Sequence, residues 1–158
     1  MEAYAGRAAM EIKARRLANA GHKTALFKIM QSRGRDRLSS GVWAKALARG
    51  DKMAIMLVER AAVAVGVAVA NAVNLTDVEA IVIGGGLGGR LGQPFVDAIN
   101  KEMLVHIVQP TRPPAVLLAE LGDLGGAIGA GLLVERLTHT STQPIKTKPP
   151  TQTRAVAD

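Results

Sequence analysis

A short β-branched run that ends directly in glycines constrains this chain most. Residues 78–83 read Val-Glu-Ala-Ile-Val-Ile, and six of the nine residues at 84–92 are glycine. Such a run is typical of a buried strand. Glycine lets the backbone turn with positive φ or approach a ligand closely. We therefore expect a ligand-binding loop at the carboxyl end of a strand, where ligands usually bind in open α/β sheets.

A second strand is predicted over residues 115–121, at the distance that a βαβ unit requires. The helix between the strands is predicted to start at Gln93-Pro94, with proline in the first turn. Its apolar residues recur every fourth position: Phe95, Ile99, Met103 and Ile107. Two short apolar strands joined by a helix imply parallel pairing. The fold class is therefore α/β, helix-rich with one βαβ unit.

Four helices are expected before the first strand, over residues 2–20, 24–32, 42–49 and about 51–75. In the first, Tyr4, Ala8 and Ile12 recur at helical spacing and are expected to face inward. In the fourth, residues 61–73 are apolar nearly all round, which predicts burial on most sides. Glu59 and Arg60 interrupt the apolar part of this helix. We therefore expect a core helix rather than a membrane span, which needs about 20 apolar residues.

The end of the chain divides into a last helix and a tail. Asp123 is expected to cap a helix over residues 124–137, whose glycines share one face and predict close packing: Gly122, Gly125, Gly126 and Gly129. From residue 138 on, Thr, Gln, Pro and Lys dominate, so residues 138–158 are predicted to be a disordered tail. Residues 1–137 are expected to form the folded part.

Composition excludes several kinds of site. The chain has no cysteine, which rules out disulfides, a thiol nucleophile and a cysteine-ligated zinc site. The three histidines, His22, His106 and His139, lack metal-ligand spacing, so no metal-ligating residue is assigned. We expect a reducing, cytoplasmic setting and no membrane partner.

Positive charge is concentrated at the start of the chain. The formal net charge is +7, and residues 1–37 hold nine Lys or Arg against three acidic residues. A basic segment can bind phosphate backbones. Here the bases lie at mixed helical angles without interleaved aromatics, which favours a solvated face over nucleic-acid binding.

The glycine segment also admits a dinucleotide-binding interpretation. Gly84, Gly86 and Gly89 match the G-x-G-x-x-G spacing. Two features oppose it: the next helix is expected to start about five residues too late, at Pro94, and the acid at the end of the next strand, Glu120, comes far later than the roughly 20 residues required. A turn without a ligand remains a further alternative.

Three segments taken in order resemble the C-terminal half of the ROK family, the bacterial glucokinase-type sugar kinases and sugar-responsive repressors. They are EAYAGRAAM at the start, VEAIVIGGGLGGRLG in the middle and LAELGDLGGAIGAGLLV at the end. The resemblance covers residues 1–137 and implies the C-terminal part of an actin-like ATPase (ribonuclease H-like) fold. It also implies an ATP-dependent hexose kinase that uses ATP with Mg²⁺ and has glucose as its first candidate substrate. A fragment of a sugar-responsive regulator is the alternative.

The resemblance assigns two binding sites and no catalytic residue. Glu2 matches the family's glutamate that binds sugar hydroxyls, and Gly84, Gly85 and Gly86 match the glycines that border adenosine. The family's Asp-x-Gly-x-Thr phosphate loop, its catalytic Asn-Asp pair, its Glu-x-Gly-His sugar segment and its cysteine zinc cluster lie upstream of the residue matching Glu2, and this sequence does not contain them. We therefore expect a fragment that is inactive alone and is completed by an N-terminal half or by a second copy.

Overall fold

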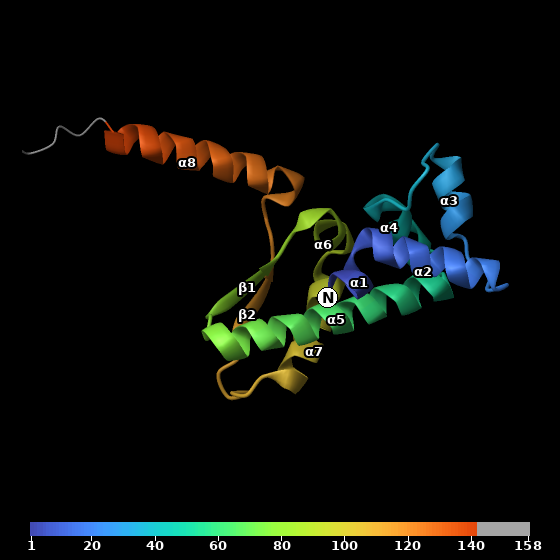
Figure 1. The fold of residues 1–158 in the computed structure, drawn as a ribbon, viewed down its shortest axis with the longest axis horizontal. Coiled ribbons are helices and arrows are strands. Elements are labelled where there is room, and N and C mark those ends of the chain that lie inside the picture. The colour runs from blue at the N-terminus through green and yellow to red at the C-terminus, as the bar shows by residue number, and fades with distance from the viewer. Residues whose placement is uncertain (142–158) are drawn as a thin grey trace, which may run out of the picture. The chain divides into compact units, whose positions relative to one another are not determined.

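Four helices open the chain and surround a small apolar core. The computed structural model describes residues 1–141. The first helices are α1 (Glu2–Ala5), α2 (Arg7–Asn19), α3 (Leu26–Ser32) and α4 (Ser40–Ala48), shown in blue and teal in Figure 1. The largest side chains buried among them are Trp43, Met10, Leu26 and Ile29.

The helix expected over residues 2–20 is broken at Gly6. This residue has extended backbone angles (φ −64°, ψ 134°), and it separates α1 from α2. The break changes which side chains face inward. Tyr4 and Ile12 are about half exposed, which contradicts the expected stripe, while Met10 and Ala14 are buried.

The long helix α5 (Lys52–Thr76) is the central element of this part of the chain. The Asp51 carboxylate caps it by accepting a hydrogen bond from the Ala54 N–H. By length and composition alone α5 could cross a membrane, yet 44% of its most apolar window is buried inside the structure. Burial on most sides was expected, but one face is buried and Val63 on another is 46% exposed.

The helix α5 packs tightly against α7 (Gln93–His106) at Gly66. A Cβ at Gly66 would lie 2.6 Å from the Cβ of Glu102 and 2.9 Å from the carbonyl oxygen of Ile99. The expected stripe of α7 is confirmed, because all four of its residues are buried: Phe95, Ile99, Met103 and Ile107.

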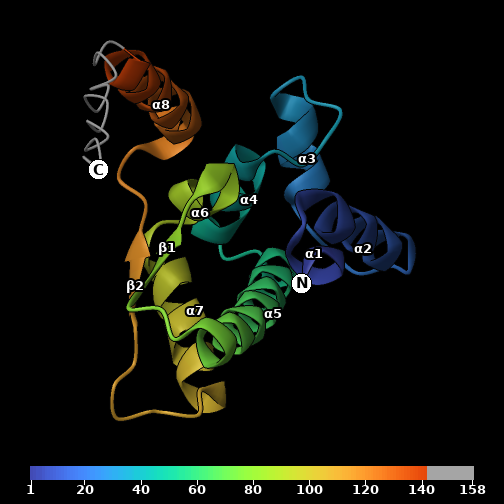
Figure 2. The same ribbon diagram turned by 60° about the vertical axis from the view of Figure 1, so that its left-hand side comes forward.

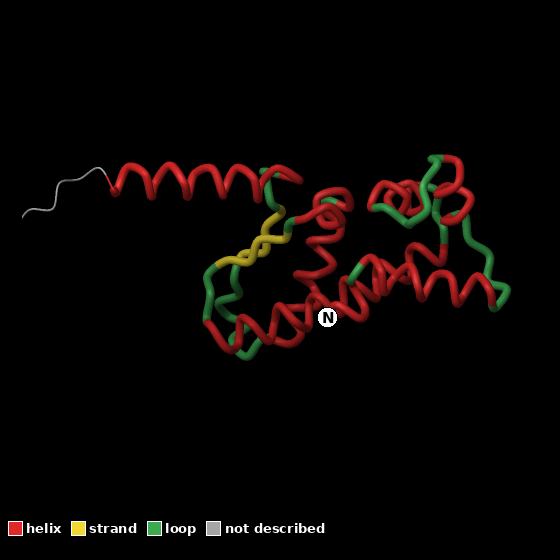
Figure 3. Tube along the Cα trace, turned by 45° about the horizontal axis from the view of Figure 1, so that its top comes forward, coloured by secondary structure: helices red, strands yellow, loops and turns green. Residues whose placement is uncertain are grey.

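The predicted βαβ unit is confirmed. Strands β1 (Ala80–Ile83) and β2 (Ala115–Leu118) pair in parallel, with Ala80 opposite Ala115. They are the yellow segments of Figure 3 and form a sheet of two strands in the described residues. Figure 2 shows α7 between this sheet and α5, and α7 packs against both.

The strands are not buried on both faces as expected. Ile81 and Val116 pack against a cluster that contains Met103 of α7 and Ile107, the residue that follows this helix. On the opposite face, Val82 is 62% exposed and Leu117 is 49% exposed. The described structure therefore covers one face of the sheet with α7 and leaves the other to solvent.

The last helix belongs to a second compact unit, which starts at Leu124. The turn η1 (Gly122–Leu124) leads into α8 (Gly125–Ser141), so residues 138–141 continue the helix where the tail was expected to begin. Residues 142–158 and the Asp123 side chain, the expected cap, lie outside the described set. A Cβ at Gly126 or Gly129 would meet no atom within 4 Å, and the close packing predicted for this glycine face stays a prediction.

Candidate functional site

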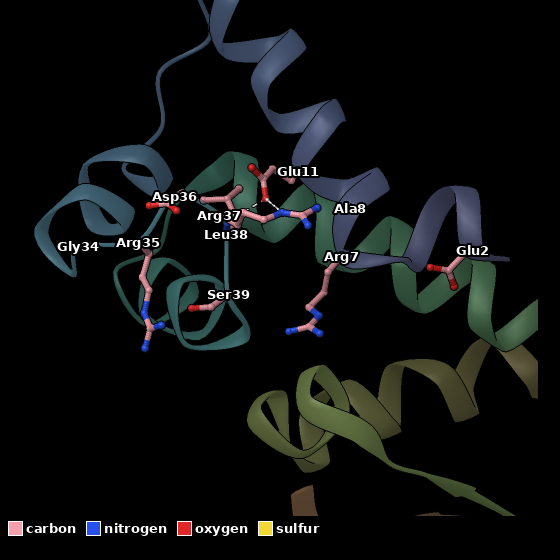
Figure 4. A pocket seen from close by; sticks show the side chains of 10 residues that line it. All are labelled: Glu2, Arg7, Ala8, Glu11, Gly34, Arg35, Asp36, Arg37, Leu38 and Ser39. Atoms are coloured by element: carbon pink, nitrogen blue, oxygen red, sulfur yellow. Dashed lines mark hydrogen bonds and ion pairs between the residues drawn. The ribbon is translucent and has the colours of Figure 1, made fainter.

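Glu2 lies at a pocket of about 550 Å³ that the first two helices form with a loop. One wall comes from α1 and α2 and holds Glu2, Arg7 and Glu11. The other wall is the segment 34–39, which connects α3 to α4. Figure 4 shows these side chains. A pocket of this size is typical of small-molecule sites.

The helix break at Gly6 positions the Glu2 carboxylate. The Glu2 side chain folds back over the Cα of Gly6, where a Cβ would overlap the carboxylate and lie 2.7 Å from the Glu2 carbonyl oxygen. Gly6 is therefore required for the space it leaves, since its φ of −64° suits any residue. Tyr4, two residues on, lies under the Arg60 guanidinium at 4.5 Å and links α1 to α5.

Glu11 fixes the two walls of the pocket to each other. This residue is 7% exposed. Its Oε1 accepts hydrogen bonds from Arg15 at 2.7 and 3.0 Å, and its Oε2 accepts one from the Leu38 N–H at 2.9 Å. Burial raises the pKa of Glu11, but these hydrogen bonds and the charges of Arg15 and Arg37 outweigh burial and lower it. The carboxylate therefore ties α2 to the loop as a charged group.

The pocket also gathers arginines that the sequence did not single out. Arg7 and Arg35 line it together with Arg37, although they lie up to 30 positions apart. The basic start of the chain was interpreted as a solvated face, and spacing alone gave no signal that these residues converge. Ser39 is the N-cap residue of α4, and its side chain makes no capping hydrogen bond.

The glycine segment after β1 folds as a helix, where a loop was expected. Gly84 is the N-cap of α6 (Gly85–Leu91), and Gly85 has φ +81°, a conformation that favours glycine. A Cβ at Gly84 would lie 3.2 Å from Ala119, next to the end of β2. At Gly85 a Cβ would meet nothing within 4 Å, so space is open beside this backbone.

The early start of α6 removes one objection to dinucleotide binding but leaves the other. An additional helix begins directly after β1, while the helix start predicted at Gln93 is confirmed by α7. The next strand, β2, still ends near residue 118, far beyond the position where the ribose-binding acid is required.

The two predicted binding sites lie on different elements of one compact unit, residues 1–123. Glu2 belongs to α1 and the glycines to the β1–α6 junction, while α4 packs against α6. The pocket at Glu2 includes Ser39, the residue at the start of α4. In Figure 4 the Arg7 side chain extends to the side of α2 where the α6 ribbon lies.

The described residues contain no group of three or more His, Asp or Glu side chains placed to hold a metal ion. Mg²⁺ in kinase sites is typically held by one or two carboxylates together with the phosphates of the substrate. We assign no chemical step to a metal within this part of the chain.

Comparison with known proteins agrees with this arrangement. An N-acetyl-D-glucosamine kinase of Yersinia pseudotuberculosis is 26% identical over 122 residues, which are 72% of this chain and 40% of the relative. A ROK family glucokinase from Streptomyces griseus, solved with glucose and AMPPNP, is 27% identical with a TM-score of 0.70 and covers 85% of this chain and 44% of that one. The ROK hexokinase from Thermus thermophilus, at 24% identity and a TM-score of 0.61, shows the fold.

The family assignment rests on most of the chain. This sequence spans about 40% of the length of the curated relatives it matches. Its structural neighbours are ROK sugar kinases, whose actin-like ATPase fold contains the helix-rich α/β arrangement described above. The family model matches residues 2–137. The chain therefore belongs to the ROK family.

Proposed function

We propose that this chain is the C-terminal part of an ATP-dependent hexose kinase, with glucose as the first candidate substrate. In this proposal the Glu2 carboxylate accepts hydrogen bonds from adjacent sugar hydroxyls. The backbone at Gly84–Gly86 borders the nucleotide. Transfer of the γ-phosphoryl group to a sugar hydroxyl requires a base and phosphate-positioning groups beyond those in this sequence.

The observation that carries the proposal is the position of Glu2. Its carboxylate lies over Gly6 at a pocket of about 550 Å³, and it forms no hydrogen bond or ion pair with other described side chains. A carboxylate kept unpaired at a pocket wall is suited to accept hydroxyl groups of a ligand.

The relatives support a kinase over the alternative of a sugar-responsive regulator. The similar proteins named above are sugar kinases, and the Streptomyces griseus enzyme was solved with both glucose and AMPPNP. The open space beside Gly85 agrees with a nucleotide passing close to the backbone.

Binding of glucose to the full chain tests the proposal. Isothermal titration is expected to show glucose binding that Glu2→Gln weakens about tenfold or more, because hydrogen bonds to charged groups contribute about 1.5–3 kcal/mol. Glu59→Gln on the exposed side of α5 is the matched control, since it removes one carboxylate away from the pocket. Equal glucose affinity in wild type and Glu2→Gln would refute the assignment.

A further inference from the structure

Two arginines of the pocket are left without partners by the fold. Among the described residues, the side chains of Arg7 and Arg35 form no hydrogen bond or ion pair, and both are exposed. The third arginine, Arg37, lies 3.9 Å from Glu11. The Glu11 carboxylate is already bonded to Arg15 and to the Leu38 N–H. The pocket therefore keeps two guanidinium groups available to a ligand.

The positions of the unpaired hydrogen-bond donors support the same conclusion. In Figure 4 the side chains of Arg7 and Arg35 extend on either side of Ser39, while the Asp36 carboxylate turns away from them. The Ser39 hydroxyl forms no hydrogen bond to α4. Two guanidinium forks and one hydroxyl thus border one cavity, and Glu2 lies beyond Arg7.

This combination selects a particular kind of ligand. A guanidinium group donates two parallel hydrogen bonds to a phosphate, and such charge-assisted bonds are stronger than neutral ones. The Glu2 carboxylate repels a bare anion but accepts bonds from hydroxyl groups. A ligand that satisfies both walls carries hydroxyls at one end and a phosphate at the other.

We infer that this pocket binds a phosphorylated hexose, the product class of the proposed kinase, with its hydroxyls on Glu2 and its phosphate between Arg7 and Arg35. The inference rests on the proposed function for the role of Glu2. It adds that the chain retains a sugar phosphate more tightly than the neutral sugar.

Titration of the full chain with glucose 6-phosphate, glucose and inorganic phosphate tests this inference. Glucose 6-phosphate is expected to bind at least about tenfold more tightly than either of the others. In Arg35→Ala and in Arg7→Ala, the ratio of glucose 6-phosphate to glucose affinity is expected to fall about tenfold. The matched control is Arg16→Ala, an exposed arginine of α2 outside the pocket.

The outcomes separate this inference from the proposed function. Equal affinity for glucose and glucose 6-phosphate, or an unchanged ratio in Arg35→Ala, overturns the phosphate site. Inorganic phosphate binding as tightly as glucose 6-phosphate overturns the hexose part. Loss of glucose binding in Glu2→Gln with an unchanged ratio in Arg35→Ala refutes the inference and leaves the proposed function standing. Binding of glucose 6-phosphate that requires Arg35 but not Glu2 overturns both the hexose part of this inference and the role proposed for Glu2.

Discussion

At the scale of single residues, Gly6 and Glu2 act as one unit. The carboxylate occupies the position that a side chain at residue 6 would take. The glycine therefore serves the site through its missing Cβ, while the carboxylate supplies the chemistry.

Gly6→Ala is expected to weaken glucose binding as strongly as Glu2→Gln, although it leaves the carboxylate in the chain. The new Cβ would lie 2.7 Å from the Glu2 carbonyl oxygen, so the backbone of α1 must shift and move the carboxylate. Titration with glucose measures the loss. Gly89→Ala, where a Cβ meets nothing within 4 Å, is the control and should bind as wild type does.

Gly85→Val is expected to abolish binding of an ATP analogue, because the side chain would fill the open space beside the backbone and because φ is +81° there. Gly92→Val imposes similar backbone strain at the other end of α6, where φ is +66°. Fluorescent-nucleotide titration should show lost binding in the first variant only. If both variants lower the melting temperature by a similar amount, backbone strain is the same in both. Loss of nucleotide binding in Gly85→Val alone is then due to the lost binding site.

The charged state of Glu11 makes stability depend on pH. Its pKa in the folded chain is below the ordinary value of 4.5, so its contribution is full above that value and is lost as the pH falls through the folded pKa. Urea unfolding should find wild type more stable than Glu11→Gln by about 1–3 kcal/mol at pH 7. This difference should shrink as the pH falls below 4.5. A difference that stays constant down to pH 3 would contradict the prediction.

At the scale of elements, the sequence predicted the helices and strands whose apolar residues follow a regular pattern. The stripe of α7 could be predicted because its apolar side chains repeat every fourth residue. The parallel pairing of β1 with β2 could be predicted because a helix joins two short apolar strands. The break at Gly6 was not predicted, because good helix formers flank it and its φ is ordinary. Helix formation at Gly85–Leu91 was missed because glycine disfavours helices by about 1 kcal/mol per residue.

The candidate site was only half visible for a related reason. Glu2 and the glycines could be assigned because they fall in contiguous segments that resemble the family. Arg7 and Arg35 line the same pocket, whose two walls are joined by the hydrogen bond from the Leu38 N–H to Glu11 across 27 positions. Such a tertiary contact leaves no local spacing to detect, so the arginines were counted as surface charge.

The contact of α5 with α7 is expected to tolerate no side chain at Gly66. In Gly66→Ala the new Cβ would lie 2.6 Å from the Glu102 Cβ, so the two helices must move apart. Overpacking of this kind costs about 1–3 kcal/mol. Chemical denaturation should show that loss, whereas Gly89→Ala, in open space on α6, should stabilise the chain by up to about 1 kcal/mol.

At the scale of the whole molecule, the uncovered sheet face governs solution behaviour. Parallel sheets are ordinarily covered on both faces. Here Val82 and Leu117 are about half exposed or more on one face. The described elements thus leave apolar strand surface available for association.

The chain alone is therefore expected to self-associate and to unfold without a sharp transition. Light scattering should report species larger than the 16.5 kDa monomer, and Val82→Lys with Leu117→Lys should reduce them. A soluble monomer with a cooperative thermal transition would show that these residues form a complete folding unit.

These 158 residues are expected not to phosphorylate glucose when ATP and Mg²⁺ are supplied, because the sequence lacks a catalytic base. A general base contributes about 10²–10⁴-fold, and no Asn-Asp pair supplies one in this sequence. A coupled assay for ADP release should stay at background. Turnover abolished by a point substitution in this chain would contradict the expectation.

The length of α5 has a mechanical consequence. Its 25 residues extend about 37 Å, and Gly66, where α7 crosses it closely, lies near the middle. The helices α1 and α2 rest on α5, and β1 with its glycines follows the carboxyl end of α5. A 5° rotation of α5 about this crossing would displace its amino-terminal end by about 1.8 Å and its carboxyl-terminal end by about 1.3 Å. Such a rotation would displace Glu2, whose helix packs on α5, relative to α7, so the angle between α5 and α7 sets the position of Glu2 relative to α7.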